Sequence, residues 1–362
     1  MQQAEYKERK KPKAPKAPRK SRPKRESHMS KGSRILLTIV CVVVGIALLL
    51  AAAVFILDRI GHSALTDDGS GMRQHENAEN IGAGRVRYKG QLYQYKNEIS
   101  TILFMGVDTK EKSASAGAYG GENQADVIVL GVLDPTTKHI TLISVSRDSM
   151  CEIEMLDQTG ASIGTARAQL ALSYSCGDGG DRSCQLTSDA VSKLFYDLPI
   201  STYASIYMNG VARLTDLVGG ITVTPQESFS TFRAGTPVVL NSSNTEAYLR
   251  YRDHTVEGNN TRMERQKAVI IELSKAMLRK VRHDPISILS IYEGISQNVT
   301  TNLNAASIVY LARVASGMTL NTDVQKVEGT SKLGAENHAE FNVDETALYE
   351  LILRTFYEPI DG

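Results

Sequence analysis

The chain has 362 residues, of which 42% are hydrophobic and 22% charged, so it can fold around a sizeable core. Its net charge of +1 is unevenly distributed: residues 1–34 carry thirteen Lys and Arg against three Asp and Glu, and the remainder has a net charge of −9. A mildly acidic folded part argues against a nucleic-acid-binding protein, whose basic residues lie on the folded surface.

The first 57 residues predict a membrane anchor. Residues 1–34 are rich in Lys, Arg and Pro and lack apolar periodicity, which is typical of a disordered basic arm. Residues 35–57 contain no charge, and a helix of that length measures about 34 Å, enough to cross a bilayer as a transmembrane helix. The charged pair Asp58-Arg59 follows directly, so we expect an uncleaved anchor. The basic arm places the N-terminus in the cytoplasm and the rest of the chain outside the cell membrane.

Residues 58–85 are polar and Gly-rich and predict a flexible extracellular stalk, followed by an extracellular domain over residues 86–362. Lys89-Gly90 separates two short alternating runs and predicts a hairpin over residues 86–95. Cys176 and Cys184 flank a short Gly-rich loop that a disulfide can close. With Cys151 there are three external thiols, so the pairing stays open and one thiol is left over.

Three β-branched apolar runs, over residues 102–107, 127–133 and 140–145, predict buried strands. Charged residues stand at or beside their ends, namely Asp108, Asp126, Arg147 and Asp148. Two carboxylates and a guanidinium at one rim of a sheet can hold a divalent cation and a phosphate. The alternative is that they are ordinary solvated charges at strand ends.

Strands and helices alternate along the rest of the chain, which favours an α/β fold with helices on both faces of a sheet. Periodicity predicts helices over residues 166–174, 187–196, 211–218, 305–316 and 346–357, and one that ends near Val281. Strands are expected over residues 203–208, 221–223, 238–240 and 324–327. Thr187 or Ser188 is the expected cap of the second helix, and Asn304 caps the fourth.

A cluster of arginines within sixteen positions is followed by a glutamine, and its members are Arg250, Arg252, Arg262, Arg265 and Gln266. The last three share one face of a helix because they are spaced i, i+3 and i+4. The first two share one side of an extended segment. Guanidinium groups bind phosphate oxygens bidentately, so an Arg cluster in an acidic domain favours phosphate binding. A solvated basic face is the alternative.

In order and spacing, these features together resemble the LytR–CpsA–Psr family, whose members attach glycopolymers to the Gram-positive cell wall. The matching features are the basic arm with one span, G-x-D at residues 106–108, an aspartate before a strand at 126, SVSRDS at 144–149, LTDLVGGITV at 214–223, AYLRYR at 247–252 and R-x-x-R-Q at 262–266. The likeness covers about residues 86–357.

The resemblance implies a three-layer α–β–α sandwich with a central mixed sheet and a pocket for a polyprenyl tail. It also implies a membrane-anchored phosphotransferase in cell-wall biogenesis. Such an enzyme moves a glycopolymer phosphate from a polyprenyl-pyrophosphate carrier to peptidoglycan and releases polyprenyl phosphate. The implied partners are therefore the lipid-linked glycan, the peptidoglycan acceptor and membrane lipid, and no nucleic acid.

Carried over by motif, the resemblance assigns Mg²⁺ (or Mn²⁺) to Asp108 and Asp126, and catalysis to Asp126 and Arg147. The pyrophosphate would be bound by Arg147, Arg250, Arg252 and Gln266, with support from Arg262 and Arg265. Gln124 is also assigned to pyrophosphate binding, but it departs from the family pattern, which commonly has an arginine two residues before the second aspartate. The lost charge-assisted hydrogen bond is worth about 1.5–3 kcal/mol, and Lys110 or Lys112 is a possible replacement.

Two alternatives to the transferase stay open. The same site can hydrolyse the lipid-linked pyrophosphate with water as the acceptor. The chain can also be a non-catalytic, regulatory protein that binds polyprenyl pyrophosphate, an alternative suggested by the neutral Gln124.

Overall fold

The computed structural model describes residues 69–109, 123–251, 256–334 and 338–361, except for the side chains of 256–260. The predicted arm and membrane span, together with Lys110, Lys112 and Arg252, lie outside these residues. Of the helices that the structure does describe, none combines the length and apolar character needed to cross a membrane.

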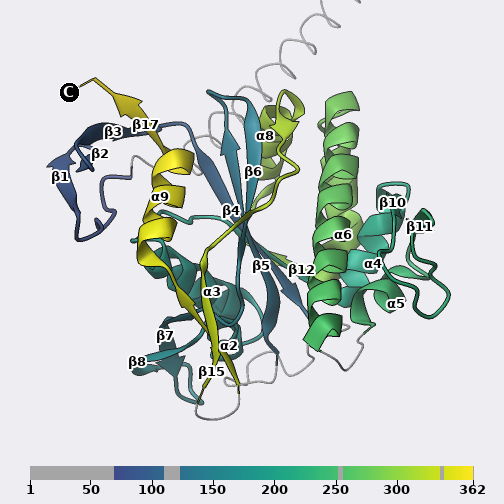
Figure 1. The fold of residues 1–362 in the computed structure, drawn as a ribbon. Coiled ribbons are helices and arrows are strands. Elements are labelled where there is room, and N and C mark those ends of the chain that lie inside the picture. Colours follow the sequence, from purple (N-terminus) through teal and green to yellow (C-terminus); the bar gives the residue numbers. More distant parts are fainter. Residues whose placement is uncertain (1–68, 110–122, 252–255, 335–337, 362) are drawn as a thin grey trace, which may run out of the picture. The chain divides into compact units, whose positions relative to one another are not determined.

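The domain is built on a seven-stranded mixed sheet with the order β12-β9-β4-β5-β6-β13, in which β14 also pairs with β6 (Figure 1). Its strands are β4 (Ser100–Val107), β5 (Ala125–Asp134), β6 (His139–Val145), β9 (Tyr203–Tyr207), β12 (Val299–Thr301), β13 (Thr319–Leu320) and β14 (Gln325–Lys326). β5 runs antiparallel to β4 and β6, and β9 runs parallel to β4. The three strands predicted from apolar runs are confirmed, each one to three residues longer than its run.

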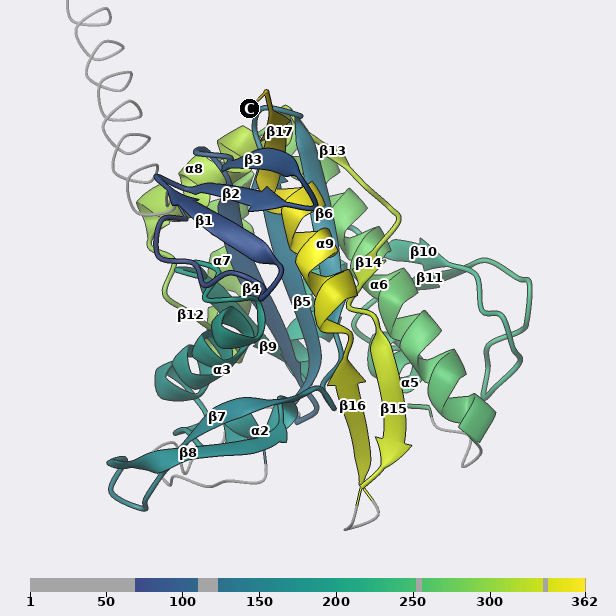
Figure 2. The same cartoon turned by 60° about the vertical axis from the view of Figure 1, so that its left-hand side comes forward.

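Helices cover both faces of this sheet and give the predicted three-layer arrangement (Figure 2). One face packs against α2 (Ala171–Ser175), α3 (Asp181–Leu194) and α9 (Glu345–Phe356). The other is covered by α4 (Met208–Leu217), α6 (Val256–His283), α7 (Ser287–Ile295) and α8 (Ala305–Ser316). The short helices α5 (Thr245–Arg250) and η1 (Ser296–Asn298) complete the set that the structure describes.

The described residues also form four smaller sheets beside the central one. They are β1-β2-β3-β17 (Ala78–Gly82, Arg85–Tyr88, Gln91–Tyr95, Tyr357–Ile360), β7-β8 (Met150–Leu156, Ser162–Gln169), β10-β11 (Ile221–Val223, Val238–Leu240) and β15-β16 (Gly329–Leu333, Ala339–Val343). The predicted hairpin over residues 86–95 is confirmed by the pairing of β2 with β3. The predicted strands over 221–223 and 238–240 are confirmed as well.

Two helix predictions need correction. Residues 166–169 belong to β8, because pairing with β7 along the whole strand overrides the local preference, and helix α2 is confined to Ala171–Ser175. Helix α3 begins at Asp181, so Thr187 lies inside it and donates to the Ser183 carbonyl at 2.9 Å instead of capping. By contrast, α8 has the predicted bounds, and the Asn304 side chain accepts from the Ser307 amide as its N-cap.

Side chains alternate along the central strands and give the sheet two unlike faces. Leu103, Ile128 and Leu130 point to the side covered by α2, α3 and α9, where they join one large buried cluster. We call this side the filled face. Phe104 and Val129 point to the side covered by α4, α6, α7 and α8, where they line a cavity. We call this side the open face.

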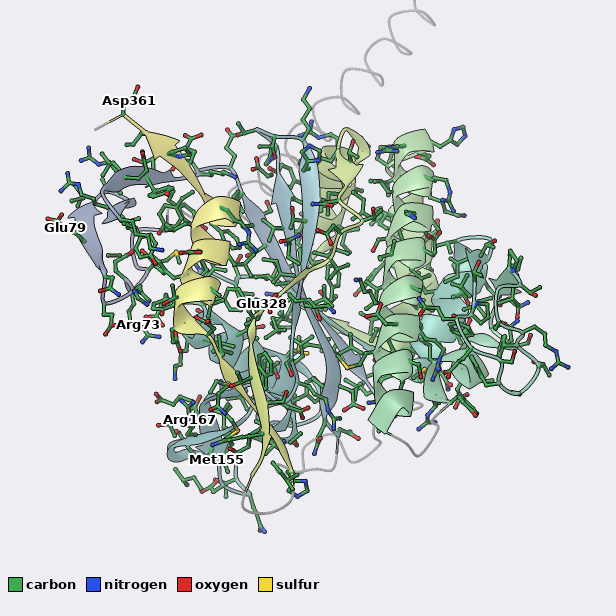
Figure 3. The ribbon with its side chains drawn as sticks, viewed as in Figure 1. Arg73, Glu79, Met155, Arg167, Glu328 and Asp361 are labelled. Atoms are coloured by element: carbon green, nitrogen blue, oxygen red, sulfur yellow. The ribbon has the colours of Figure 1, made fainter. Side chains whose placement is uncertain are left out.

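The stretch assigned to a stalk is ordered where the structure describes it, from residue 69 onward. Met72 and His75 are buried, and the Arg73 side chain (Figure 3) donates to the Lys193 carbonyl at the end of α3. Strand β1 pairs with β2. This segment therefore packs on the domain, which begins before Val86.

The three cysteines of the described residues are all buried and free. Cys184 lies within α3 and is fully buried in the cluster on the filled face, whereas the Cys176 sulfur contacts the Met155 sulfur at 3.7 Å. The disulfide considered between Cys176 and Cys184 is therefore absent from this structure.

Candidate active site

Strand register brings the predicted strand-end charges to one rim of the sheet. Strands β4 and β6 end where β5 begins, because β5 is antiparallel to both. The β5–β6 ladder pairs Ile128 with Val145, so one further step of two residues sets Asp126 opposite Arg147. Asp108 directly follows Val107, which pairs with Ala125.

Each predicted metal-binding carboxylate contacts a guanidinium group. The Arg147 Nη1 atom donates to Asp126 Oδ1, and these side chains are 36% and 11% exposed. Arg250 is the last residue of helix α5, so the extended conformation predicted for it is wrong. Its Nε atom lies 3.1 Å from Asp108 Oδ1 and its Nη1 atom 3.0 Å from Glu246 Oε1. The structure thus joins residues from β4, β5, β6 and α5 into one charged rim.

Asp148 also belongs to this rim, although it was not assigned a role from the sequence beyond its place at a strand end. Its Oδ1 atom lies 3.5 Å from Arg147 Nε. Burial raises the pKa of Asp148, the Asp126 carboxylate adds to the rise, and the charges of Arg147 and Arg262 oppose it. The signal in the sequence was its position next to Arg147. Its burial depends on tertiary packing.

The open face of the sheet encloses a cavity of about 480 Å³, which continues from the charged rim. Most of its wall is aliphatic and comes from β4, β5, β6, β9, α4, α6, α7 and α8. Among the residues that the structure describes, five side chains place charged or amide groups in this wall, those of Asp108, Asp126, Arg250, Arg262 and Gln266. Arg262 is only 8% exposed. The arrangement suits an amphipathic ligand with an anionic end and a long apolar part.

Arg265 was predicted to support phosphate binding, but its guanidinium does not line this cavity. It contacts the Glu227 carboxylate and donates to the carbonyls of Tyr248 at 3.2 Å and Tyr251 at 2.5 Å. It also stacks over Phe229, 4.6 Å from the ring centre. Arg265 is 4% exposed and fixes the backbone on both sides of Arg250, so its geometry is that of a positioning residue.

Gln124 and Arg252 are the two remaining residues of the predicted set. Gln124 is half-buried and stands just before β5, but it is not part of the cavity wall. Arg252 lies outside the described residues. Of the predicted set, the rim therefore combines Asp108, Asp126 and Arg147 with the cluster residues Arg250, Arg262 and Gln266.

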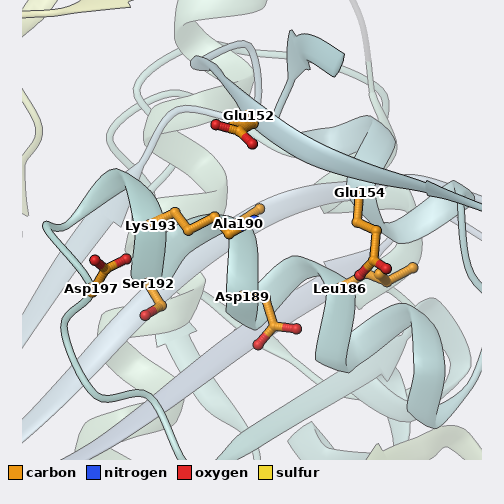
Figure 4. Close-up of a pocket in the computed structure, with 8 residues that line it drawn as sticks. All are labelled: Glu152, Glu154, Leu186, Asp189, Ala190, Ser192, Lys193 and Asp197. Atoms are coloured by element: carbon orange, nitrogen blue, oxygen red, sulfur yellow. The ribbon is translucent and has the colours of Figure 1, made fainter. Parts of the chain in front are cut away.

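A second, smaller concavity of about 210 Å³ lies between β7 and α3 (Figure 4). Glu152 and Glu154 face Asp189 there, and among the described residues that line it Lys193 is the single cation. Burial raises the pKa of Asp189. This wall repels anions, so the cavity on the open face is the candidate site for a phosphorylated ligand.

The donor set of the rim is compatible with Mg²⁺. Within the described residues there is no group of three or more His, Cys, Asp or Glu side chains arranged to hold a metal. Mg²⁺ is commonly held by one or two carboxylates, with waters and substrate phosphates as the other ligands. Asp108 and Asp126 supply oxygen ligands of this kind beside the phosphate-binding side chains.

The fold and the site define a class of protein, a three-layer α/β domain that encloses an apolar cavity beneath a charged rim. The family model described as the LytR_cpsA_psr family matches residues 66–354. The chain therefore belongs to this family, as the sequence motifs predicted.

Two of the curated relatives compared with this chain carry the name of one kind of transferase, and a third is named as a regulatory protein. The chain is 27% identical over 286 residues to the polyisoprenyl-teichoic acid–peptidoglycan teichoic acid transferase TagV of Bacillus subtilis, covering 75% of this chain and 68% of that protein. It is 25% identical to the transferase TagU of the same organism, covering 75% of this chain and 82% of TagU. Biofilm regulatory protein A of Streptococcus mutans is 30% identical, over 57% of this chain and half of that protein's length.

Solved structures support the fold. The crystal structure of B. subtilis TagV matches 71% of this chain and 96% of its own with a TM-score of 0.53 and 24% identity. A protein from Streptococcus agalactiae matches 71% of this chain and 87% of its own with a TM-score of 0.56 and 23% identity. At this level of identity the likeness establishes the mixed α/β architecture.

Proposed function

We propose that this chain is a membrane-anchored phosphotransferase that moves a glycopolymer phosphate from polyprenyl pyrophosphate to a peptidoglycan hydroxyl. The names of the relatives TagU and TagV support a role in glycopolymer transfer. The observation that carries the proposal is the apolar cavity of about 480 Å³ that ends in carboxylates and guanidinium groups. A lipid pyrophosphate has this same division between an apolar chain and an anionic head.

In this proposal the prenyl chain occupies the cavity on the open face, and the pyrophosphate lies at the rim. Arg250, Arg262 and Arg147 neutralise the phosphate oxygens, and Gln266 donates to them through its amide. Such charge neutralisation and positioning account for most of the catalysis in phosphoryl transfer. Mg²⁺, held by Asp108 and Asp126, would withdraw charge from the phosphate oxygens.

The reaction forms one bond and breaks one. The acceptor hydroxyl oxygen bonds to the glycan-bearing phosphorus, and the bond from that phosphorus to the bridging oxygen breaks. Polyprenyl phosphate leaves with the bridging oxygen. The hydroxyl proton passes to a rim carboxylate, and Asp148 suits this role because burial raises its pKa.

The test uses the full chain with a lipid-linked glycan donor and peptidoglycan fragments. Asp126→Ala and Arg147→Ala are each expected to lower transfer by at least about 100-fold, since removing one preorganised charge contact costs this much in other enzymes. Arg167→Ala is the matched control, because Arg167 is exposed on β8. Circular dichroism checks that each variant folds. Full transfer by both rim variants would contradict the proposal.

Hydrolysis is the second candidate, because Arg147 is 36% exposed and the rim is therefore open to water. The same assay separates the two reactions when its products are compared with and without peptidoglycan fragments. Transfer predicts glycan joined to the acceptor. Free glycan phosphate as the sole product, even with acceptor present, identifies a hydrolase.

A further inference from the structure

The end of the domain opposite the charged rim carries a group of basic side chains, which we call the basic end. Its members are Lys138 in the β5–β6 turn, Arg279, Lys280 and Arg282 at the end of α6, and Arg313 in the last turn of α8. These segments lie together at the upper end of Figure 1. Arg282 donates to the Met318 carbonyl, and the Lys138 carbonyl accepts from the Thr319 amide at 2.9 Å. The segments therefore form one continuous surface.

The charge of this surface contrasts with the rest of the chain beyond its N-terminal arm. Residues 135–139, 279–286 and 313–318 contain five Lys and Arg and one acidic residue, Asp284, for a net charge of +4. Residues 35–362 together have a net charge of −9. Asp134, at the end of β5, pairs with Lys96 at 2.9 Å and adds no net charge. The basic end is thus a local site of attraction for anions.

Apolar residues accompany the basic ones. Ile286, in the connection from α6 to α7, is 59% exposed. Ile140 on β6, Ile288 on α7, Ala315 on α8 and Leu320 on β13 pack together beside these segments and line the cavity there. A surface that combines exposed aliphatic residues with Lys and Arg is typical of proteins that lie on anionic membranes.

The direction in which the cavity runs, from its charged rim to its aliphatic end, agrees with a membrane-facing basic end. Its charged rim lies at one end of the sheet and its aliphatic end beside the basic end. A lipid drawn outward from a bilayer keeps its tail toward the membrane and its head away from it. If the basic end faces the membrane, the aliphatic end of the cavity therefore points toward the bilayer and its charged rim away from it.

The point where the chain enters the domain lies at this same end. Gly69 packs against the ring of Tyr95, so close that a Cβ atom there would lie 2.5 Å from it. Lys96, which follows Tyr95 in the sequence, forms an ion pair with Asp134 beside the β5–β6 turn. Residues 58–68 separate Gly69 from the predicted membrane span, and eleven residues reach at most about 40 Å. A membrane anchor before residue 58 would therefore keep the basic end near the bilayer.

We propose that the basic end docks on anionic phospholipid head groups, with Ile286 inserted among them, so that the open face receives its lipid substrate directly from the membrane. The proposal rests on the proposed function only for the identity of that substrate. Docking itself requires no turnover, so it can be tested separately.

The chain contains no tryptophan, which allows a single reporter to be introduced. The full chain with Ile286→Trp is reconstituted into phosphatidylglycerol vesicles whose acyl chains are brominated. Bromine quenches tryptophan only at short range, so we expect at least a twofold loss of emission together with a shift to shorter wavelength. Ile163→Trp, on β8 and 66% exposed in the wild type, is the control and is expected to be unquenched. Equal quenching at both positions, or none at Ile286→Trp, overturns the proposal.

Charge variants in the Ile286→Trp background test the head-group contact. Each basic residue near an anionic surface contributes about fivefold to binding. Arg279→Gln with Lys280→Gln should therefore weaken docking about 25-fold, and phosphatidylcholine vesicles should weaken it further. If quenching is the same with the double substitution and with phosphatidylcholine vesicles as without them, the basic end does not contact head groups. An emission shift that persists in detergent and grows with protein concentration shows that a second copy covers the surface, and it also overturns the proposal. A docking failure with intact transfer would leave the proposed function standing.

Discussion

The two faces of the central sheet are built from the same strands but differ in how they are packed. On the filled face, Leu103, Ile128 and Leu130 are at most 1% exposed within one buried cluster. On the open face, Phe104 is 43% exposed although it lies in the middle of β4. Gly131 makes room for it there, because a Cβ atom at that position would lie 3.0 Å from the Phe104 ring.

This difference separates stability from function within one sheet. A cavity forfeits dispersion contacts along its wall, so the open face contributes less to folding than its apolar composition suggests. The filled face must supply the larger share of the free energy of folding. We therefore expect substitutions on the two faces to affect different measurements.

The largest expected effect is on stability, from a truncation on the filled face. Leu130→Ala should lower the free energy of unfolding by about 2–5 kcal/mol, because it leaves a new void in a close-packed cluster. Phe104→Ala should lower it by less than about 1.5 kcal/mol, because that ring is partly exposed and already borders a cavity. Denaturant unfolding of both variants measures the difference. Similar losses would show that the open face is packed as tightly as the filled one.

A buried ion pair offers a smaller, pH-dependent test of the filled face. Asp134 and Lys96 lie 2.9 Å apart, with side chains 9% and 13% exposed. Burial alone would raise the pKa of Asp134, but hydrogen bonds from Lys96 and Thr137 outweigh it and lower the pKa. A lowered pKa stabilises the fold above the unfolded value of about 4, and this stabilisation is lost as the pH falls through the folded value.

Asp134→Asn is accordingly expected to lower the free energy of unfolding by about 2 kcal/mol at pH 7, since Lys96 is left buried beside a neutral amide. The difference from wild type should shrink as the pH falls below about 4, the unfolded value, and vanish once the pH lies below the lowered pKa of the folded state. Asp361→Asn, at an exposed position near the C-terminus, is the control. A difference that stays constant with pH would mean that the Asp134 charge does not contribute.

On the open-face side, Arg265 tests how the rim is held. Arg265→Lys keeps the charge but cannot reach Glu227 and the carbonyls of Tyr248 and Tyr251 together. Arg250 should then shift relative to Asp108, with about a tenfold loss of kcat/KM, expressed mainly as a higher KM for the lipid donor. Arg233→Lys, at an exposed position, is the control. An unchanged KM would reduce Arg265 to a purely structural role.

Elements with strong periodic patterns were predictable from the sequence, and elements defined by pairing were not. Strands β4, β5 and β6 have long β-branched runs, and α8 has both periodicity and the Asn304 cap. Strand β8 is exposed along most of its length, so it lacks an alternating apolar signal. Only its partner β7 defines it as a strand.

The candidate site divides in the same way. Asp108, Asp126 and Arg147 could be found because strand ends place them on one rim. The role of Arg265 could not, because the loop that brings Glu227 and Phe229 against it is distant in sequence. The pattern of continuous apolar runs indicated that these strands are buried. It did not reveal which face is hollow, a property that depends on how the helices pack.

The smallest expected effect concerns Gln124, where the family commonly has an arginine. The β4–β5 ladder pairs Val107 with Ala125, so its next step places Gln124 opposite Asp108. Because Gln124 is half-buried and outside the cavity wall, a new guanidinium there should contribute about 0.5–1 kcal/mol. Gln124→Arg should thus raise kcat/KM about two- to fivefold, with exposed Gln158→Arg as the control.

An increase in kcat/KM for Gln124→Arg would show that the native rim is active but short of one charge. If wild type and Gln124→Arg both bind the lipid pyrophosphate and neither transfers the glycan nor hydrolyses the pyrophosphate, the open face is a binding site without catalysis.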